Sequence, residues 1–350
     1  MTPPNPAGRP RKRSSSAARR GKGRPKTPAP VPAPPEYLKR LGVQPRKSLG
    51  QHFLVDEFLL SDIADATVRD PATTVLEIGA GPGGLTEELA GRAEHVVAVE
   101  LDEDLSSLTR TRLERFEGLH VLAADIMEFA PAELLAEAGI DGSAPYVAVG
   151  NLPYYITQPI VRKLLEADPA PERIVILVQR EVALRMVGGA GKESLLSMSV
   201  KMYGEPRLLF PVPRQAFWPP PKVQSAVIEI ERFPRPALDM PPGEITAFFH
   251  IVRAGFAQPR KQLHNSMVDE SGLPHDAILA MIEAVGIDPA ARPQHLSLPD
   301  WERLYREFQA RFPGELDVAP EIEAPADHPH PNLPPSRGKG SEAETEDADD

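Results

Sequence analysis

A glycine-rich segment, E-I-G-A-G-P-G-G-L-T (residues 77–86), directly follows a short run of β-branched residues. Gly79 and Gly81 begin a G-x-G-x-x-G pattern, which lets the backbone turn sharply and approach a ligand closely. Glu100 closes the next apolar run, where a carboxylate can accept hydrogen bonds from both ribose hydroxyls of an adenosine. Asp125 closes the third run, where it can accept from an adenine amino group. The pattern therefore predicts a site for an adenosine-containing cofactor.

This loop and its acidic residues fit either a nicotinamide enzyme or a methyltransferase. The sequence contains no Tyr-x-x-x-Lys pair, so it lacks the residues of the common short-chain reductases. The fourth apolar run also ends in a motif for which a reductase has no use. These two observations favour a methyltransferase.

That motif is N-L-P-Y-Y (residues 151–155), at the expected carboxyl end of a parallel strand, where such sheets bind their ligands. The amino group of adenine is a poor nucleophile because its lone pair is delocalised into the ring. The Asn151 side-chain oxygen and the Leu152 carbonyl can accept hydrogen bonds from both N–H groups and favour a more tetrahedral nitrogen. Pro153 stiffens the loop, and Tyr154 can stack on an unstacked base. The motif predicts methylation of adenine N6.

Short buried runs alternate with helical patterns over the part of the chain that carries these motifs. Five such runs are T-T-V-L-E-I-G, H-V-V-A-V-E-L, L-H-V-L-A-A-D, Y-V-A-V-G-N and R-I-V-I-L-V-Q. They predict βαβ units and a parallel sheet with helices on both faces. Two later runs, P-R-L-L-F-P-V-P and K-V-Q-S-A-V-I-E-I-E-R-F, predict a hairpin at the sheet edge. After Pro242 only helical patterns occur. We expect a Rossmann-like α/β domain over 36–240 and a small all-helical domain over 241–312.

Charge is distributed unevenly along the chain. Residues 1–35 carry nine Lys or Arg and no acidic residue, and residues 313–350 carry eleven Asp or Glu against two basic residues. Both tails are predicted to be disordered because they have too few large apolar residues to offset the entropy of ordering. Residues 36–312 have a net charge of −11, so any RNA contact must use local cations. The candidates are Arg46, Lys47, Lys222, Arg253, Arg260 and Lys261.

Other sequence features indicate the cellular compartment in which the protein is expected. The chain has no cysteine, which excludes disulfides and thiolate chemistry and suits a reducing cytoplasm. No apolar run approaches the roughly 18 residues of a membrane-spanning helix, and no secretory signal is expected at the N-terminus. We therefore expect a cytoplasmic protein without a membrane partner.

Five segments together resemble a known family. They are K-S-L-G-Q-H-F-L-V-D, the glycine-rich loop, N-L-P-Y-Y-I, F-W-P-P-P-K-V-Q-S-A (residues 217–226) and Q-P-R-K-Q-L-H-N-S (residues 258–266). In this combination the sequence resembles the ribosomal RNA adenine N6,N6-dimethyltransferase family, specifically its small-subunit (16S) branch, over about residues 37–310. The resemblance implies a class I methyltransferase fold and S-adenosyl-L-methionine as the cofactor.

The resemblance also implies roles for individual residues. Phe217 resembles the aromatic residue that faces the target base opposite Tyr154, although the sequence alone makes Trp218 equally eligible. No metal is implied in the active site. The expected catalytic residues are Asn151, Leu152, Tyr154 and Phe217. The expected cofactor-binding residues are His52, Leu54, Gly79, Gly81, Glu100, Asp125 and Asn151.

The implied substrate is a pair of adjacent adenosines in the 3′-terminal hairpin of 16S rRNA, reached by a monomeric enzyme in an assembling small subunit. Three alternatives remain open at this stage. They are a large-subunit rRNA adenine N6-methyltransferase, an NAD-dependent oxidoreductase, and a non-catalytic RNA-binding assembly factor. The intact N-L-P-Y-Y motif argues against the last, because a scaffold would not need it.

Overall fold

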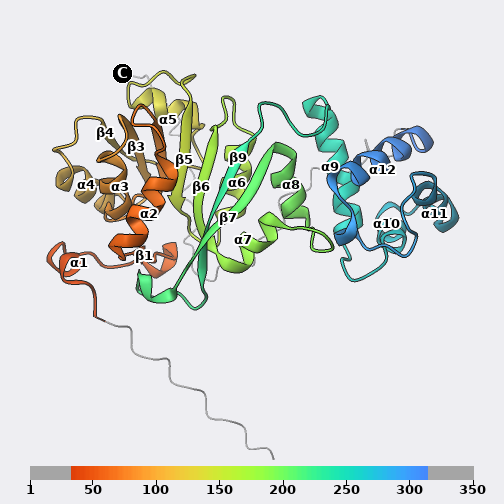
Figure 1. The fold of residues 1–350 in the computed structure, drawn as a ribbon, viewed down its shortest axis with the longest axis horizontal. Coiled ribbons are helices and arrows are strands. Elements are labelled where there is room, and N and C mark those ends of the chain that lie inside the picture. The colour runs from red at the N-terminus through yellow and green to blue at the C-terminus, as the bar shows by residue number, and fades with distance from the viewer. Residues whose placement is uncertain (1–32, 314–350) are drawn as a thin grey trace, which may run out of the picture. The chain divides into compact units, whose positions relative to one another are not determined.

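A computed structural model describes residues 33–313, and a seven-stranded sheet with helices on both faces dominates it (Figure 1). The predicted disordered tails lie outside the described residues, apart from residues 33–35 and 313. Five strands are parallel, as the alternating runs predict, and confirm the Rossmann-like α/β fold. In spatial order they are β4 (Leu119–Ala123), β3 (His95–Glu100), β2 (Thr74–Ile78), β5 (Tyr146–Asn151) and β6 (Arg173–Gln179).

The last two strands of the sheet are antiparallel, which confirms the predicted pair. β9 (Ser225–Arg232) lies between β6 and β7 (Gly204–Val212), so β7 forms the edge of the sheet opposite β4. The F-W-P-P-P segment between them leaves the sheet. There β8 (Phe217–Trp218) pairs antiparallel with β1 (Phe53–Leu54), which follows α1 (Glu36–Arg40) and the short η1 (Lys47–Leu49). The N-terminal motif is thereby joined to a segment more than 150 residues later in the chain.

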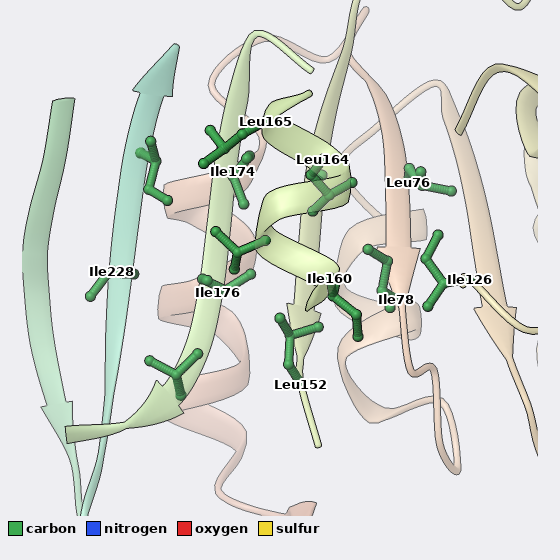
Figure 2. Close-up of a cluster of buried hydrophobic side chains, with 14 of the residues drawn as sticks. Leu76, Ile78, Ile126, Leu152, Ile160, Leu164, Leu165, Ile174, Ile176 and Ile228 are labelled. Atoms are coloured by element: carbon green, nitrogen blue, oxygen red, sulfur yellow. The ribbon is translucent and has the colours of Figure 1, made fainter. Parts of the chain in front are cut away.

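Helices bury the two faces of the sheet in separate clusters. Figure 2 shows one of them, where Leu76 and Ile78 of β2 and Ile174 and Ile176 of β6 lie beneath Ile160. Burial of such side chains stabilises the fold by about 1.5–3 kcal/mol each. That face is covered by α5 (Pro131–Glu137), α6 (Thr157–Leu165) and α7 (Arg180–Val187). The opposite face is covered by α2 (Glu57–Thr67) and α3 (Gly84–Ala90), while α4 (Glu103–Arg112) contacts β3 and β4.

The later helices share a separate hydrophobic cluster, centred on Trp301, Tyr305 and Phe248. Met198 and Met202 of α8 (Leu195–Tyr203) belong to it. The other members come mainly from α9 (Pro242–Phe256), α10 (Leu263–Ser271), α11 (His275–Ala284), η3 (Pro293–His295) and α12 (Leu298–Arg311). Within the described residues no strand follows β9, as predicted. Contacts group these helices with the sheet in one unit that begins at Ala33, so the boundary at residue 240 stays a prediction.

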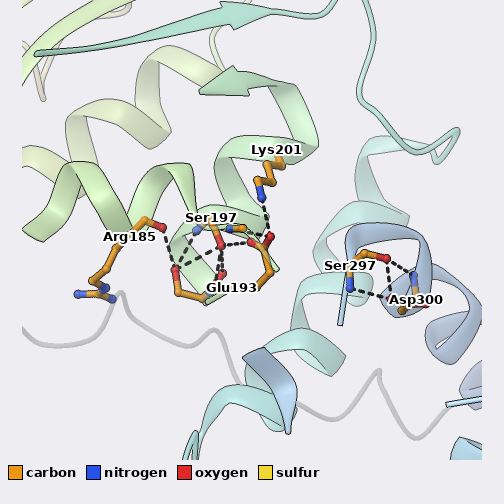
Figure 3. Close-up of polar contacts among 8 residues, drawn as sticks. Arg185, Glu193, Ser197, Lys201, Ser297 and Asp300 are labelled. Carbon is orange, nitrogen blue, oxygen red and sulfur yellow. Dashed lines mark hydrogen bonds and ion pairs between the residues drawn. The ribbon is translucent and has the colours of Figure 1, made fainter. Parts of the chain in front are cut away.

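Polar contacts fix the starts of α8 and α12 (Figure 3). The Glu193 carboxylate accepts hydrogen bonds from Ser197 Oγ and Lys201 Nζ, both at 2.6 Å. Ser194 caps α8, because its Oγ accepts a hydrogen bond from Ser197 N at 3.1 Å. Ser297 caps α12 in the same way, because its Oγ accepts from Asp300 N at 3.4 Å, while its own N–H donates to Asp300 Oδ2 at 2.8 Å. These caps pair backbone groups that a helix start would otherwise leave unsatisfied. None of the described helices is long and apolar enough to cross a membrane.

Close packing of α9 against α12 generates a stability prediction. A Cβ at Gly255 would lie 2.2 Å from Trp301 Cη2 and 2.9 Å from Leu263 Cδ1, so the helices would have to separate. Gly255→Ala should lower the free energy of unfolding by about 1–3 kcal/mol, the usual cost of overpacking. Gly243→Ala on the same helix is the control, because nothing lies within 4 Å of its Cβ. Equal melting temperatures for the two variants would contradict this packing.

Candidate active site

The carboxyl ends of four adjacent parallel strands meet at one edge of the sheet and border a cavity of about 150 Å³. Loops after β2, β3, β4 and β5 supply most of its lining, and the segment before β1 closes it from the other side. Eight of the predicted residues line this cavity: His52, Gly79, Gly81, Glu100, Asp125, Asn151, Leu152 and Tyr154. The motifs found separately in the sequence therefore form a single site.

The glycine-rich loop needs its glycines at two positions beside the cavity. Gly79 has φ of 80° and Gly81 has φ of 55°, in the left-handed region that side chains rarely adopt. A Cβ at Gly81 would also lie 3.3 Å from the Phe53 ring. The loop can therefore lie directly under a bound ligand.

Glu100 is held in place by this loop. Its Oε2 accepts a hydrogen bond from Gly81 N at 2.7 Å, and its Oε1 accepts one from Asp102 N at 2.9 Å. Each carboxylate oxygen can accept a further hydrogen bond, so the group remains able to bind hydroxyls. Burial raises the pKa of Glu100, against the opposing effect of these two bonds. At the next strand end, Asp125 Oδ1 accepts from Met127 N at 2.8 Å.

Asn151 ends β5, and its side chain is oriented by the N-terminal segment. Its Nδ2 donates to the His52 carbonyl at 2.9 Å, so Oδ1 is the oxygen that remains to accept from a ligand. The partner carbonyl is itself placed by the pairing of β1 with β8. A neutral side-chain oxygen is therefore presented to the cavity in a fixed orientation.

Two aromatic rings border the same part of the cavity. The Tyr154 hydroxyl lies 2.7 Å from Ser225 Oγ, and His52 Nδ1 donates to the Pro219 carbonyl at 2.7 Å. Their ring centroids are 6.0 Å apart and their planes differ by 25°. Burial raises the pKa of the Tyr154 hydroxyl, which keeps it neutral. Both rings are tethered at one end and offer apolar surface to a planar ligand.

Two predicted residues lie outside this lining. Leu54 lines a second, smaller cavity under the glycine-rich loop. Phe217 is 2% exposed and packs in the cluster between the sheet and α2. The β1–β8 pairing holds it there, opposite Leu54. A stacking role for Phe217 stays a prediction, and it would require these strands to move.

The sequence interpretation missed two apolar residues. Leu101 directly follows Glu100 at the end of β3, Ile126 directly follows Asp125 just beyond β4, and both line the cavity. Leu101 is 50% exposed, which is unusual for a leucine beside a buried strand. An apolar residue after an acidic strand end, repeated on neighbouring strands, is the signal that was available. Their side chains can hold the faces of a flat ring.

Not all of the candidate RNA-binding cations are free to contact RNA, because two of them form ion pairs within the protein. Arg46 forms ion pairs with Asp102 at 3.1 Å and Asp104 at 2.6 Å, and Lys261 pairs with Asp269 at 2.8 Å. Lys222 and Arg260 are exposed, Arg253 is half-buried, and the side chain of Lys47 is outside the described residues. Their contact with RNA stays a prediction. No group of three or more His, Asp or Glu side chains in residues 33–313 is arranged to hold a metal ion.

Comparison with solved structures places the fold among rRNA methyltransferases. The 23S rRNA methyltransferase ErmE aligns with a TM-score of 0.58 and 29% identity over 73% of this chain and 98% of that one. A dimethyladenosine transferase from Plasmodium falciparum aligns with a TM-score of 0.60 over 74% and 98% of the two chains. Its 23% identity supports the fold alone. These similarities confirm the class I methyltransferase fold with a helical C-terminal part.

Comparison with curated proteins is more specific. A ribosomal RNA small subunit methyltransferase A from Dehalococcoides mccartyi is 40% identical over 77% of this chain and 90% of the relative. Its namesake from Staphylococcus aureus is 36% identical over 79% and 93% of the two chains. The family described as ribosomal RNA adenine dimethylase matches residues 42–310, which include every residue of the cavity lining. The chain therefore belongs to the ribosomal RNA adenine dimethylase family.

Proposed function

We propose that this protein uses S-adenosylmethionine to dimethylate N6 of two adjacent adenosines in the 3′-terminal hairpin of 16S rRNA during small-subunit assembly. The observation that carries the proposal is the Asn151 side chain, whose amide is tied to the His52 carbonyl so that Oδ1 faces the cavity that Glu100 borders. The relatives named small subunit methyltransferase A support the 16S substrate. We propose that the protein carries out this methylation as a monomer in the cytoplasm.

The cavity residues fit the cofactor. Glu100 can accept from the two ribose hydroxyls, Asp125 from the adenine amino group, and Leu101 and Ile126 can flank the adenine ring. Gly79 and Gly81, with φ of 80° and 55°, allow the loop to turn beneath the cavity with no side chain between its backbone and a ligand. When bound, S-adenosylmethionine supplies an electrophilic methyl group on a sulfonium.

The chain's contribution to the chemistry is to bind and orient the adenine. Asn151 Oδ1 and the Leu152 carbonyl accept hydrogen bonds from the N6 amino group, which favours the tetrahedral geometry that this nitrogen needs for attack. Tyr154 stacks on the flipped base, and its tether to Ser225 fixes the ring. Such hydrogen bonds matter most in the transition state, so they raise the rate more than the affinity.

The alternatives are weaker. The 36–40% identical relatives are small-subunit enzymes, whereas the large-subunit enzyme ErmE is 29% identical, which favours the 16S substrate. Membership of an adenine dimethylase family speaks against an NAD-dependent oxidoreductase. The direct test is to incubate the protein with radiolabelled S-adenosylmethionine and unmethylated small subunits and to map the labelled nucleotides. Label at adenosines outside the 3′-terminal hairpin would contradict the proposal.

Cofactor affinity should depend on Glu100. Glu100→Gln keeps the side-chain shape but replaces one acceptor oxygen with an NH2 group and removes the charge. We expect it to weaken S-adenosylmethionine binding by about 1–3 kcal/mol, as for loss of charge-assisted hydrogen bonds. Titration calorimetry measures this, with nicotinamide dinucleotides as the negative control. Tight nicotinamide binding with no response to S-adenosylmethionine would refute the assignment.

Removing the Asn151 amide should affect catalysis more than binding. Asn151→Ala should lower the methylation rate by about 10²-fold or more, a typical cost of losing one preorganised hydrogen-bonding group. Asn151→Asp keeps an acceptor oxygen but cannot donate to the His52 carbonyl, so its rate should fall in between. Single-turnover rates and calorimetric affinities separate the two effects. An Asn151→Ala variant that methylates at the wild-type rate would exclude the role.

The form of the substrate should matter because the folded body is net acidic and has few free cations. A few phosphate contacts bind weakly unless their geometry matches a prefolded surface. We expect efficient methylation of partly assembled small subunits, and poor methylation of naked RNA, the isolated hairpin and complete ribosomes. The double variant Lys222→Glu with Arg260→Glu should weaken subunit binding and leave cofactor affinity unchanged. Equal methylation rates on the hairpin and the subunit would show that assembly state is not recognised.

A further inference from the structure

The glycine-rich loop is held by two side chains of α4 that take no part in the proposed cofactor contacts. Thr109 and Arg112 lie on the same face of this helix, one turn apart. The Thr109 hydroxyl donates to the Gly81 carbonyl at 2.9 Å, and Arg112 Nη2 donates to the Gly83 carbonyl at 2.5 Å. Neither side chain lines the cavity, so any effect on a ligand must pass through the loop.

The hydroxyl of Thr109 has an unusual partner for a residue inside a helix. Ser and Thr hydroxyls within helices ordinarily donate to the carbonyl four residues earlier. Thr67 does so in α2, where its hydroxyl donates to the Ile63 carbonyl at 2.7 Å. Thr109 is equally buried, with 0% of its surface exposed, but its hydroxyl donates out of the helix to Gly81. The Gly81 carbonyl is therefore held by a hydrogen bond that is sheltered from water.

Gly81 is the residue at which this contact can influence the site. Its N–H donates to Glu100 Oε2 at 2.7 Å, while its carbonyl accepts from Thr109. The N–H and the carbonyl belong to two successive peptide planes, which are joined through the φ and ψ angles of this residue. Glycine has wide freedom in both angles, so contacts must select the observed φ of 55°. The bond from Thr109 therefore helps to set the direction of the N–H that holds Glu100.

Arg112 holds the loop at its other end. Gly83 directly precedes α3 and has φ of 81°. Arg112 also forms an ion pair with Glu87 of α3 at 2.5 Å. A Cβ at Gly83 would lie 2.8 Å from both Arg112 Nη2 and Thr109 Cγ2, so the loop packs closely on α4. This end of the loop is fixed to both helices, which limits the ways in which Gly81 can move.

We propose that Thr109 is a positioning residue for cofactor binding, because it holds Gly81 in the conformation that orients the Glu100 carboxylate. The inference rests on the proposed function, in which Glu100 binds the ribose. Without the hydroxyl, the Gly81 carbonyl loses its partner and the glycine gains conformational freedom. Ordering the loop and Glu100 then has to be offset by binding free energy, which lowers the affinity.

The test is calorimetric titration of S-adenosylhomocysteine into the folded protein. Thr109→Val removes the hydroxyl and keeps the β-branched shape. We expect it to weaken binding about tenfold, as for loss of one buried hydrogen bond. Thr109→Ala, whose smaller side chain cannot overpack the loop, should show a similar loss. Thr109→Ser keeps the hydroxyl and should restore wild-type affinity.

Thr111→Val is the matched control. It makes the same change on the same helix, but the Thr111 side chain is exposed, so binding should not change. A Thr109→Val protein that melts at a lower temperature but binds S-adenosylhomocysteine as tightly as wild type has lost stability alone, and overturns the inference. Failure of S-adenosylhomocysteine to bind the wild-type protein would instead overturn the proposed function.

A double-mutant cycle tests whether Thr109 acts through Glu100. In a Glu100→Ala background the carboxylate is absent, so Thr109→Val should cause little further loss of affinity. Additive losses would show that Thr109 acts independently of Glu100 and would contradict the inference. Methylthioadenosine keeps the ribose but lacks the amino-acid end, so Thr109→Val should weaken its binding by the same factor. A loss confined to S-adenosylhomocysteine would also contradict it.

Kinetics separate positioning from chemistry. Asn151 is oriented by the His52 carbonyl and not by α4. Thr109→Val should therefore raise the KM for S-adenosylmethionine about tenfold and leave kcat near the wild-type value on unmethylated small subunits. A fall in kcat at saturating cofactor with an unchanged KM would refute the role assigned to Thr109.

Discussion

Parallel strands bring their carboxyl ends to the same edge of a sheet, and the whole site depends on this constraint. Glu100 and Asn151 lie at the ends of β3 and β5, Asp125 lies just beyond β4, and the glycine-rich loop leaves β2 between them. Residues spread over about 75 positions of sequence therefore border one cavity. The hydrophobic clusters on the two faces of the sheet hold the strands in register. The polar groups at the strand ends are therefore held in positions that loops alone would not fix.

The N-terminal segment completes the site through a pairing that local patterns could not reveal. The sequence singles out both the segment around His52 and the one around Phe217, but not that β1 and β8 form a two-stranded sheet. Pairing between distant segments leaves no periodic signal in either of them. The same pairing explains why Phe217 lies in the core. Side chains alternate along β8, so the Phe217 ring faces the large sheet while the Trp218 ring packs with Leu38 and Phe53 on the other side.

Most of the fold could be predicted, because buried runs alternating with helical patterns admit few arrangements. The position of β9 between β6 and β7 could not, since two antiparallel strands can join a sheet in either order. Within the site, the prediction found polar residues and glycines, whose chemistry is specific. It missed Leu101 and Ile126, because an apolar residue beside a strand is ordinarily part of the core.

The charges around the cavity also select the kind of ligand that can bind there. Among the described residues, no Lys or Arg lines either cavity, while Glu100 and Asp125 line the larger one and Glu77 the smaller. A dinucleotide would bring a negatively charged pyrophosphate to the glycine-rich loop, and no Lys or Arg in the described lining would offset its repulsion by the carboxyl groups of the larger cavity. A cofactor with a sulfonium and an ammonium is attracted by the same carboxyl groups. The acidic site also repels RNA phosphates, so only the extruded base should enter it, and the cations that hold the backbone must lie outside the cavity.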